Sequence, residues 1–444
     1  MTVTETRRRT SWPADLALVA AVLMAGSVSR HAVYTPFGVV LLVACVLALA
    51  VALWQGGAAR VAPSRPAVLA ALALAVVGQL IKPPYMNVVA RNAMLRAGIY
   101  VCIGVTVLAA LLLLPRLRAR SGAVAAVAGL GIAYGLVVAG AKPVIDVWPI
   151  LQGAARGLVD GRNPYDMVFA GVPAGQVNNC FNYLPGTFLV PLPGRLLFGD
   201  VRYAEAAVLL AGVAALVWLA ARSGRPGAVP LALLAGTLPG SLYDVQQAWN
   251  ETIIFGALAG GGVLLAVRRP WWAAACFAVA LCTKQHVVLL LPLWALWPAF
   301  GPRRALGAAA GAAAVTLPFF LWNPGRFWHC VVEFFVDLPA RTDSLSVWQW
   351  VPGPLETATV LLLLAAAYAL VLRGVPRTPG GLLLGSGLVL AAFDLANKQS
   401  FLNQWLLAAQ LVVAGLAVTA ATTRPVREVP LPAAAPPDAA VRRP

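Results

Sequence analysis

The chain has 444 residues, of which 60% are hydrophobic and 11% are charged, and its formal net charge is +17. Soluble domains are about 45–50% apolar and about 25% charged, so this composition excludes a soluble enzyme, a nucleic-acid-binding protein and a disordered chain. The apolar residues form runs of roughly 15–20 residues between short polar breaks, which is typical of membrane-spanning helices. The alternation that a membrane β-barrel needs is missing from the sequence. We therefore predict an all-α polytopic membrane protein.

The apolar runs predict about fourteen transmembrane helices, within a range of about 11 to 14. The runs at 270–283 and 286–300 are short for about 30 Å of hydrocarbon and can be read as one broken helix. The run at 184–199 contains three prolines, so we interpret it as a re-entrant or interfacial segment facing outward. The predicted spans are 14–29, 37–54, 66–81, 97–114, 122–141, 204–221, 228–242, 250–267, 270–283, 286–300, 304–321, 353–373, 379–395 and 402–420.

The basic residues cluster at the ends of these runs, as the positive-inside bias predicts. With both termini in the cytoplasm, every cluster falls on the inner side, and together they hold most of the 33 lysines and arginines. The net charge is therefore a signal of topology, and we expect no nucleic-acid partner. The clusters are Arg7 to Arg9, Arg60 and Arg65, Arg116, Arg118 and Arg120, Arg222 and Arg225, Arg268 and Arg269, Arg303 and Arg304, Arg373 and Arg377, and Arg424, Arg427, Arg442 and Arg443.

The same reading divides the chain into three regions. Residues 1–141 form an N-terminal transmembrane block, and residues 142–420 form a second transmembrane region with outer loops at 142–203 and 323–352. Residues 421–444 are rich in proline and alanine, and we predict a disordered cytoplasmic tail. Cys180 and Cys330 both fall on the outer side, where they are either two free thiols or a disulfide.

Mixed polar residues collect on the predicted outer side, whereas the predicted span centres hold almost no ionisable residues. Transporters more often place ionisable residues near the bilayer midplane, so the pattern favours a site at the membrane–water interface. The polar segments are 146–183, 244–251, 284–286, 323–350 and 397–404.

The first outer loop predicts a short amphipathic helix that lies in the interface. From Val147 onward the apolar residues recur at three- and four-residue steps. Arg156 and Asp160 are spaced to form an i,i+4 ion pair, and Asp160-Gly161 then ends the helix. Asp146 stands where the fifth span emerges. Its carboxylate is an N-cap of this helix, a general base beside the bilayer, or both.

Three motifs in this region resemble a known superfamily. They are an aspartate after an outward-going span (Asp146), a turn of the G-x-N-P-Y type (161–165) and an aromatic-Tyr-x-Pro segment (Phe181, Tyr183, Pro185). Together they resemble the integral-membrane glycosyltransferases of the GT-C superfamily, above all the bacterial polyprenyl-phosphate-mannose-dependent α-mannosyltransferases of glycosyltransferase family 87. The resemblance covers roughly residues 130–410. In that family the aspartate follows the first span, whereas four further spans precede it here.

The resemblance implies a GT-C-like fold and a multi-pass enzyme of the bacterial cell membrane. The enzyme would transfer a hexose, with mannose favoured, from a polyprenyl-phosphate-sugar donor to a lipid or cell-envelope glycan acceptor at the extracytoplasmic face. Asp146 would deprotonate the acceptor hydroxyl. The partners implied are the donor, the acceptor and membrane lipids. The alternatives are a non-enzymatic transporter or lipid flippase, and an assembly partner in an envelope-synthesis complex that has lost catalysis.

Cationic residues on the outer side are candidates to stabilise the charge of a phosphate leaving group. The alternative for the two lysines is snorkelling to the interface, and the alternative for the histidine is a structural role. Each lysine is followed by glutamine on the same predicted face, which favours a phosphate site. The candidates are Lys284, His286, Lys398 and Arg341, with Arg326 behind them.

Amides and tyrosines on the outer side are candidates to bind a sugar or the acceptor, with Trp249 as a stacking face. The alternative is ordinary interfacial loop chemistry with a tryptophan anchor. The sequence has no D-x-D motif, so we assign no metal ligand and no cofactor and leave metal dependence open. The candidates are Gln246, Gln247, Asn250, Tyr165, Tyr183, Gln285 and Gln399.

Overall fold

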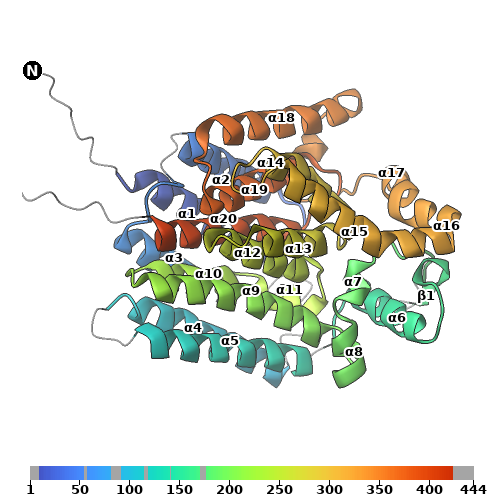
Figure 1. Cartoon of the computed structure of the whole chain (residues 1–444), viewed down its shortest axis with the longest axis horizontal. Helices are drawn as coiled ribbons and strands as arrows, with labels where there is room; N and C mark the ends of the chain where they lie inside the picture. The colour runs from blue at the N-terminus through green and yellow to red at the C-terminus, as the bar shows by residue number, and fades with distance from the viewer. Residues whose placement is uncertain are drawn as a thin grey trace, which may run out of the picture.

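The computed structural model describes residues 10–54, 58–81, 92–114, 119–140, 142–170 and 177–423. Long helices run side by side along a shared direction, and smaller helices gather at one end (Figure 1). Within these ranges nine helices are long and apolar enough to cross a membrane, or ten if one bent pair is a single span. The predicted all-α, multi-span class is confirmed.

The long apolar helices correspond to predicted spans. They are α1 (Trp12–His31), α2 (Pro36–Trp54), α4 (Ala93–Leu111), α5 (Ala119–Gly140), α9 (Arg202–Ser223), α15 (Pro302–Trp322), α18 (Glu356–Gly374), α19 (Pro379–Ala396) and α20 (Leu402–Thr422).

The other predicted spans are shorter or broken helices. The run 286–300, predicted as half of a broken helix, is the 3-10 helix η4 followed by α14. The run 228–242 bends by 41° between α10 and α11, where Pro239 precedes Gly240 at φ +96°, a backbone angle that glycine tolerates best. The elements concerned are α3 (Arg65–Leu80), α10 (Ala228–Thr237), α11 (Ser241–Gln247), α12 (Glu251–Ala266), α13 (Pro270–Leu281), η4 (Gln285–Leu290) and α14 (Leu291–Ala295).

The centre of the bundle is formed by helices that are apolar on every face. Nearly all residues of α19 and α20 are buried, and α20 packs against α1, α10 and α12 as well as α19. A helix that is apolar all round lies in a protein core or spans a membrane, and α19 and α20 are surrounded by other helices of this chain. Helices of the predicted N-terminal block pack on the rest of the chain, α1 on α20 and α5 on α9. At the periphery, α18 exposes Leu361 and Leu362.

The small elements gather at one end of the bundle (Figure 1). Among them, α7 and α8 replace the proline-rich run 184–199, and a break at Pro191 confirms that this run is not one straight helix. The elements of this end are α6 (Val147–Val159), η3 (Pro164–Asp166), the antiparallel strands β1 (Phe169–Ala170) and β2 (Val177–Asn178), α7 (Gly186–Leu189), α8 (Leu192–Phe198), α16 (Pro324–Trp328), the π-helix η5 (His329–Glu333), α17 (Phe334–Asp337), and the 3-10 helices η6 (Val347–Trp350) and η7 (Gly353–Leu355).

The predicted amphipathic helix is α6, which confirms its bounds and pattern. Its inward face buries Ile150 and Leu151. Arg156 Nε lies 3.7 Å from Asp160 Oδ2, so the predicted i,i+4 ion pair is formed. The helix ends at Asp160, and Gly161 follows at φ +75°. Most of the predicted disordered tail and the basic residues Arg7 to Arg9, Arg116, Arg118 and Arg424 onward lie outside the described residues. Arg120 lies in α5, and residues 421 and 422, which were predicted as the start of the tail, belong to α20.

Candidate functional site

A cavity of about 1050 Å³ lies among the small elements and the adjoining helix ends. Its walls come from all five outer polar segments of the sequence: the junction of α5 and α6 with the residues after β2, the start of α12, the start of η4, the stretch from η5 to Asp343, and the turn from α19 to α20. These segments are separated by up to 250 residues and meet because successive helices bring their ends to the same side. The structure thus brings residues of the five predicted polar segments together around one cavity.

Part of the cavity lining is apolar, and we call these residues the apolar wall. It combines aliphatic side chains of η4 and η5 with the aromatic rings of α17 and α19. The rest of the lining carries the acids, amides and cations described below, and the two kinds are neighbours in places: His286 lies against Phe393. The cavity therefore offers both a hydrophobic surface and a charged one to the same occupant. The apolar wall contains Val288, Leu289, Val331, Val332, Phe334, Phe335, Leu338 and Phe393.

Asp146 lines the cavity at the first bend after α5. It occupies the N-cap position of α6 but makes no capping hydrogen bond, so the N-cap interpretation is wrong. The reason is its backbone: φ −70° and ψ −19° are helical, whereas a capping residue needs an extended backbone to turn its side chain onto the next amides. Asp146 is exposed at the cavity surface, yet desolvation by the surrounding protein raises the pKa of its carboxyl above the usual value, and its own backbone amide and the positive charge of Arg341 partly offset this.

Lys284 lines the cavity but is already paired. Its Nζ lies 2.6 Å from Glu251 Oε1, and both side chains are largely withdrawn from solvent. The ammonium also lies 5.9 Å from the ring centroid of Tyr183. Glu251 neutralises the charge that the sequence assigned to a phosphate. The sequence placed Glu251 at the end of the polar segment 244–251 but did not single it out as a site residue.

Arg341 and Lys398 form a second cationic group in the cavity lining, and the amide of Arg341 donates to the carbonyl oxygen of Lys398 at 3.3 Å. Arg341 makes two hydrogen bonds to Asp343, at 2.8 and 2.6 Å, and these raise the pKa of its guanidinium. The guanidinium also lies 4.8 Å from the ring centroid of Phe401. Lys398 Nζ donates to the carbonyl oxygen of Val336 at 3.0 Å, and no ion pair joins it to a described residue. This lysine brings an uncompensated charge to the cavity.

Most of the predicted polar ligands also line the cavity. Gln285 donates to the carbonyl oxygens of Asn182 and Val331, at 3.0 and 3.2 Å, and Gln399 donates to that of Pro339 at 3.3 Å. His286 lies parallel to the ring of Phe393 with 6.5 Å between centroids. The predicted residues on the cavity surface are Asp146, Lys284, His286, Lys398, Arg341, Asn250, Tyr183, Gln285 and Gln399, together with Trp249.

Three predicted ligands are fully buried outside the cavity lining, which corrects their assignment. Gln246 donates to the carbonyl oxygen of Lys142, and Gln247 accepts from the amide of Val144. Both amides are therefore engaged with the backbone that leads to Asp146. Tyr165 belongs to the aromatic core of this end, and its hydroxyl donates to the carbonyl oxygen of Tyr183 at 2.9 Å.

A disulfide joins Cys180 to Cys330, so the bonded form of the two alternatives is the one observed. It connects the segment after β2 to η5, and residues on both sides of it line the cavity: Asn178 and Asn182 on one, Val331 on the other. The bond thus fastens two walls to each other. In the described part of the chain, no group of three or more His, Cys, Asp or Glu residues is arranged to hold a metal ion.

Comparison with known proteins gives a limited likeness. No protein-family model and no curated protein matches the chain. A crystal structure of ArnT from Cupriavidus metallidurans in the apo state is similar at 18% identity and a TM-score of 0.45, over 68% of this chain and 60% of that one. The same ArnT bound to undecaprenyl phosphate is similar at 17% identity and a TM-score of 0.45, over 67% of this chain and 59% of that one. The chain thus spans about 60% of the length of these ArnT chains.

Proposed function

We propose that this protein is an integral-membrane glycosyltransferase of the GT-C type. It transfers a hexose, with mannose favoured, from a polyprenyl-phosphate donor to a lipid or cell-envelope glycan acceptor. One observation carries the proposal: a single cavity is lined by the uncapped carboxylate of Asp146, by the cations Lys398 and Arg341, and by apolar side chains of η4, η5, α17 and α19.

Each part of the cavity suits one part of this reaction. The acceptor oxygen forms a bond to the anomeric carbon, the bond from that carbon to the phosphate oxygen breaks, and Asp146 takes the hydroxyl proton. Lys398 and Arg341 stabilise the negative charge that develops on the lipid phosphate. The apolar wall accepts the first isoprene units, and the amides of Asn250, Gln285 and others can bind sugar hydroxyls.

We further propose that the cavity faces the extracytoplasmic side of a bacterial cell membrane. Disulfides persist in oxidising compartments, and the Cys180–Cys330 bond lies beside the cavity. The arginine clusters occupy the other ends of the helices, as at the carboxyl ends of α9 and α18, which the positive-inside bias places in the cytoplasm.

A transporter or lipid flippase is the second candidate, and one observation favours it. Glu205, Asp244 and Asp394 are buried in the helix bundle, and at least one carboxylate oxygen of each has no hydrogen-bond partner among the described residues. Ionisable side chains buried in this way often line a transport path. If they do so here, transport will depend on these acids and no sugar will be transferred.

The test is a transfer assay in membranes with radiolabelled polyprenyl-phosphate mannose. Wild type should transfer the sugar, and Asp146→Asn should lower kcat by a factor of about 10² to 10⁴, the usual contribution of a general base. Asp160→Asn is the matched control, because it removes an exposed acid at the other end of α6 and should leave transfer unchanged.

Two results would overturn the proposal. Full activity in a correctly folded Asp146→Asn protein would show that Asp146 is not the general base. No transfer by wild type from this donor or from other polyprenyl-phosphate hexoses would remove the donor class and leave the transporter reading.

A further inference from the structure

The chain that leads to Asp146 is held in place by two buried amides. Gln246 Nε2 donates to the carbonyl oxygen of Lys142 at 2.9 Å, four residues before Asp146. The amide of Val144, two residues before it, donates to Gln247 Oε1 at 3.1 Å. Both glutamines come from α11, so this helix fixes the approach to the carboxylate.

The chain that leaves Asp146 is held by a second element. Two residues after the carboxylate, Trp148 Nε1 donates to Asp200 Oδ1 at 3.1 Å. Gln152, about one turn further along α6, donates to the carbonyl oxygen of Gly199 at 2.9 Å and accepts from the amide of Val201 at 3.0 Å. The turn before α9 therefore holds α6 at two points.

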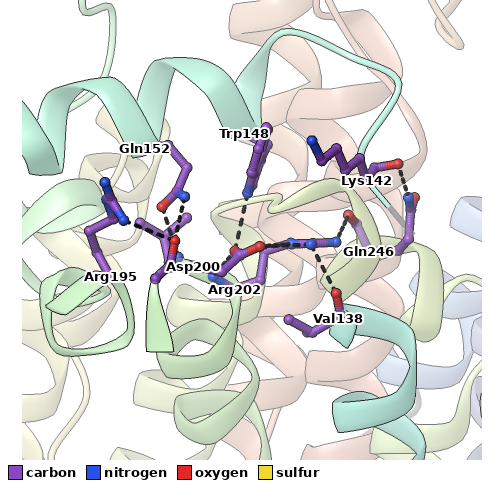
Figure 2. A network of polar contacts seen from close by, with 10 residues as sticks. Val138, Lys142, Trp148, Gln152, Arg195, Asp200, Arg202 and Gln246 are labelled. Atoms are coloured by element: carbon purple, nitrogen blue, oxygen red, sulfur yellow. Dashed lines mark hydrogen bonds and ion pairs between the residues drawn. The ribbon is translucent and has the colours of Figure 1, made fainter. Parts of the chain in front are cut away.

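Arg202 joins these two sets of contacts (Figure 2). Its guanidinium donates to both carboxylate oxygens of Asp200, with a shortest distance of 2.7 Å. It also donates to the carbonyl oxygen of Gln246 at 3.2 Å and to that of Val138, near the end of α5, at 3.0 Å. The Arg202 side chain is 3% exposed. A rigid, multiply bonded guanidinium in this position connects α5, α9 and α11.

We propose that this network, which we call the α6 clamp (Trp148, Gln152, Asp200, Arg202 and Gln246), positions Asp146 for catalysis. The inference rests on the proposed function. The clamp residues are positioning residues: they lie outside the cavity lining and act through the backbone on both sides of the carboxylate. Asp146 itself makes no capping bond, so the clamp fixes its place while leaving its carboxylate free for the acceptor.

The physical reason is that proton transfer tolerates little change in the distance between the base and the atom that it deprotonates. A general base must lie within about 2.6–3.2 Å of the atom that it deprotonates, and a shift of about 1 Å can cost roughly 10²-fold in rate. Asp146 stands at a bend between two helices, where no regular helical hydrogen bonds hold the chain on its amino-terminal side. Bonds at residues 142, 144, 148 and 152 supply the missing restraint.

The experiment compares two tryptophans that each donate one indole hydrogen bond. Trp148→Phe removes the donor to Asp200 and keeps an aromatic ring. Trp297→Phe, the matched control, removes a donor to the carbonyl oxygen of Thr378 at 2.9 Å, far from the cavity. For each full-length protein we would measure kcat, the donor KM, and hydrogen exchange of the amides of residues 144–152.

We expect Trp148→Phe to lower kcat about tenfold or more, with a donor KM within about twofold of wild type and faster exchange at 144–152. Trp297→Phe should change neither kcat nor exchange in that segment. Gln152→Met, at the edge of the clamp, is the second variant if Trp148→Phe does not fold, and it should act in the same direction with a smaller loss of kcat.

The inference is overturned if Trp148→Phe matches Trp297→Phe in both kcat and exchange while wild type is active. It is also overturned if the loss appears in KM alone. If wild type transfers no sugar, the proposed function fails. Hydrogen exchange at residues 144–152 then still tests whether the α6 clamp restrains this segment. An unchanged exchange rate in Trp148→Phe would show that it does not, and a faster rate would show that it does.

Discussion

Two ion pairs line the cavity, and they differ in burial. In the pair of Lys284 with Glu251 the side chains are 14% and 1% exposed, whereas in the pair of Arg341 with Asp343 they are 53% and 37% exposed. The sequence suggested the same role, phosphate binding, for both cations. The structure shows that the two cations differ in how easily each can leave its carboxylate partner and bind another anion.

From this difference in burial we infer different roles for the two ion pairs. A buried acid that loses its partner leaves an uncompensated charge, so the Lys284–Glu251 pair is costly to open. An exposed pair contributes little to stability and can be opened cheaply. We therefore expect Lys284 to remain with Glu251 and shape the cavity, while Arg341, beside Lys398, turns from Asp343 to the phosphate of a bound donor.

The largest effect should follow from breaking the buried pair. Glu251→Gln leaves Lys284 without a counter-charge, and we expect a loss of about 3–5 kcal/mol in the free energy of unfolding. Thermal unfolding in detergent micelles would measure it. The control is the double variant with Lys284→Met, which removes both charges and should be more stable than Glu251→Gln alone. Equal stability of all three proteins would show that the pair is not a structural unit.

A smaller effect, on pH dependence and donor binding, should follow from Arg341→Gln. A base works when deprotonated, so activity is lost as pH falls through its pKa. Desolvation already raises the pKa of Asp146, and Arg341 holds it down; removing this cation should move the acid limb of kcat/KM to higher pH. The donor KM should rise roughly tenfold, since hydrogen bonds to charged groups contribute about 1.5–3 kcal/mol.

A pH–rate profile for Arg341→Gln checks this prediction. Arg162→Gln is the control, because it removes an exposed arginine that pairs with Asp160 at the far end of α6. An acid limb that moves equally in both variants, or in neither, would show that the charge of Arg341 does not set the pKa of Asp146.

The smallest effect should come from Asp343→Asn. Because the pair is exposed, stability should change by less than about 1 kcal/mol. Arg341 would lose its competing partner, so the donor KM should fall. Titration of the variant and wild type with a short-chain polyprenyl phosphate would show the change directly. Weaker binding in Asp343→Asn would mean that Asp343 orients Arg341 rather than competes for it.

The sequence predicted the all-α class and the places of the nine long apolar helices of the described residues, because hydrophobic runs are local signals. Five of its fourteen predicted spans are shorter or broken helices. The sequence also predicted that five polar segments share one site, since alternating crossings bring them to one end. It did not predict the partner of Lys284. Glu251 lies 33 residues away, and no periodicity relates residues that meet only through packing of α12 against the segment after α13.

The glutamines of α11 show a second limit of sequence reasoning. Gln246 and Gln247 were expected to contact a sugar because amides at a helix end suit hydroxyl groups. The same amides suit backbone carbonyls and amides equally well, and which partner they meet depends on how α11 turns after its bend. Asp146 illustrates the reverse case: its place before a helix favoured a cap, and only its backbone angles exclude that role.

The Cys180–Cys330 bond has a consequence for how the molecule is made. Its two ends are 150 residues apart, and α9 through α16 are synthesised between them. Most of the helix bundle has therefore been synthesised before Cys330 can form a bond with Cys180. Residues 178–182 cannot be cross-linked to η5 before that stage, so this part of the cavity is completed late in synthesis. In a chain that ends before residue 330, Cys180 would lack its partner and could form a disulfide with another thiol.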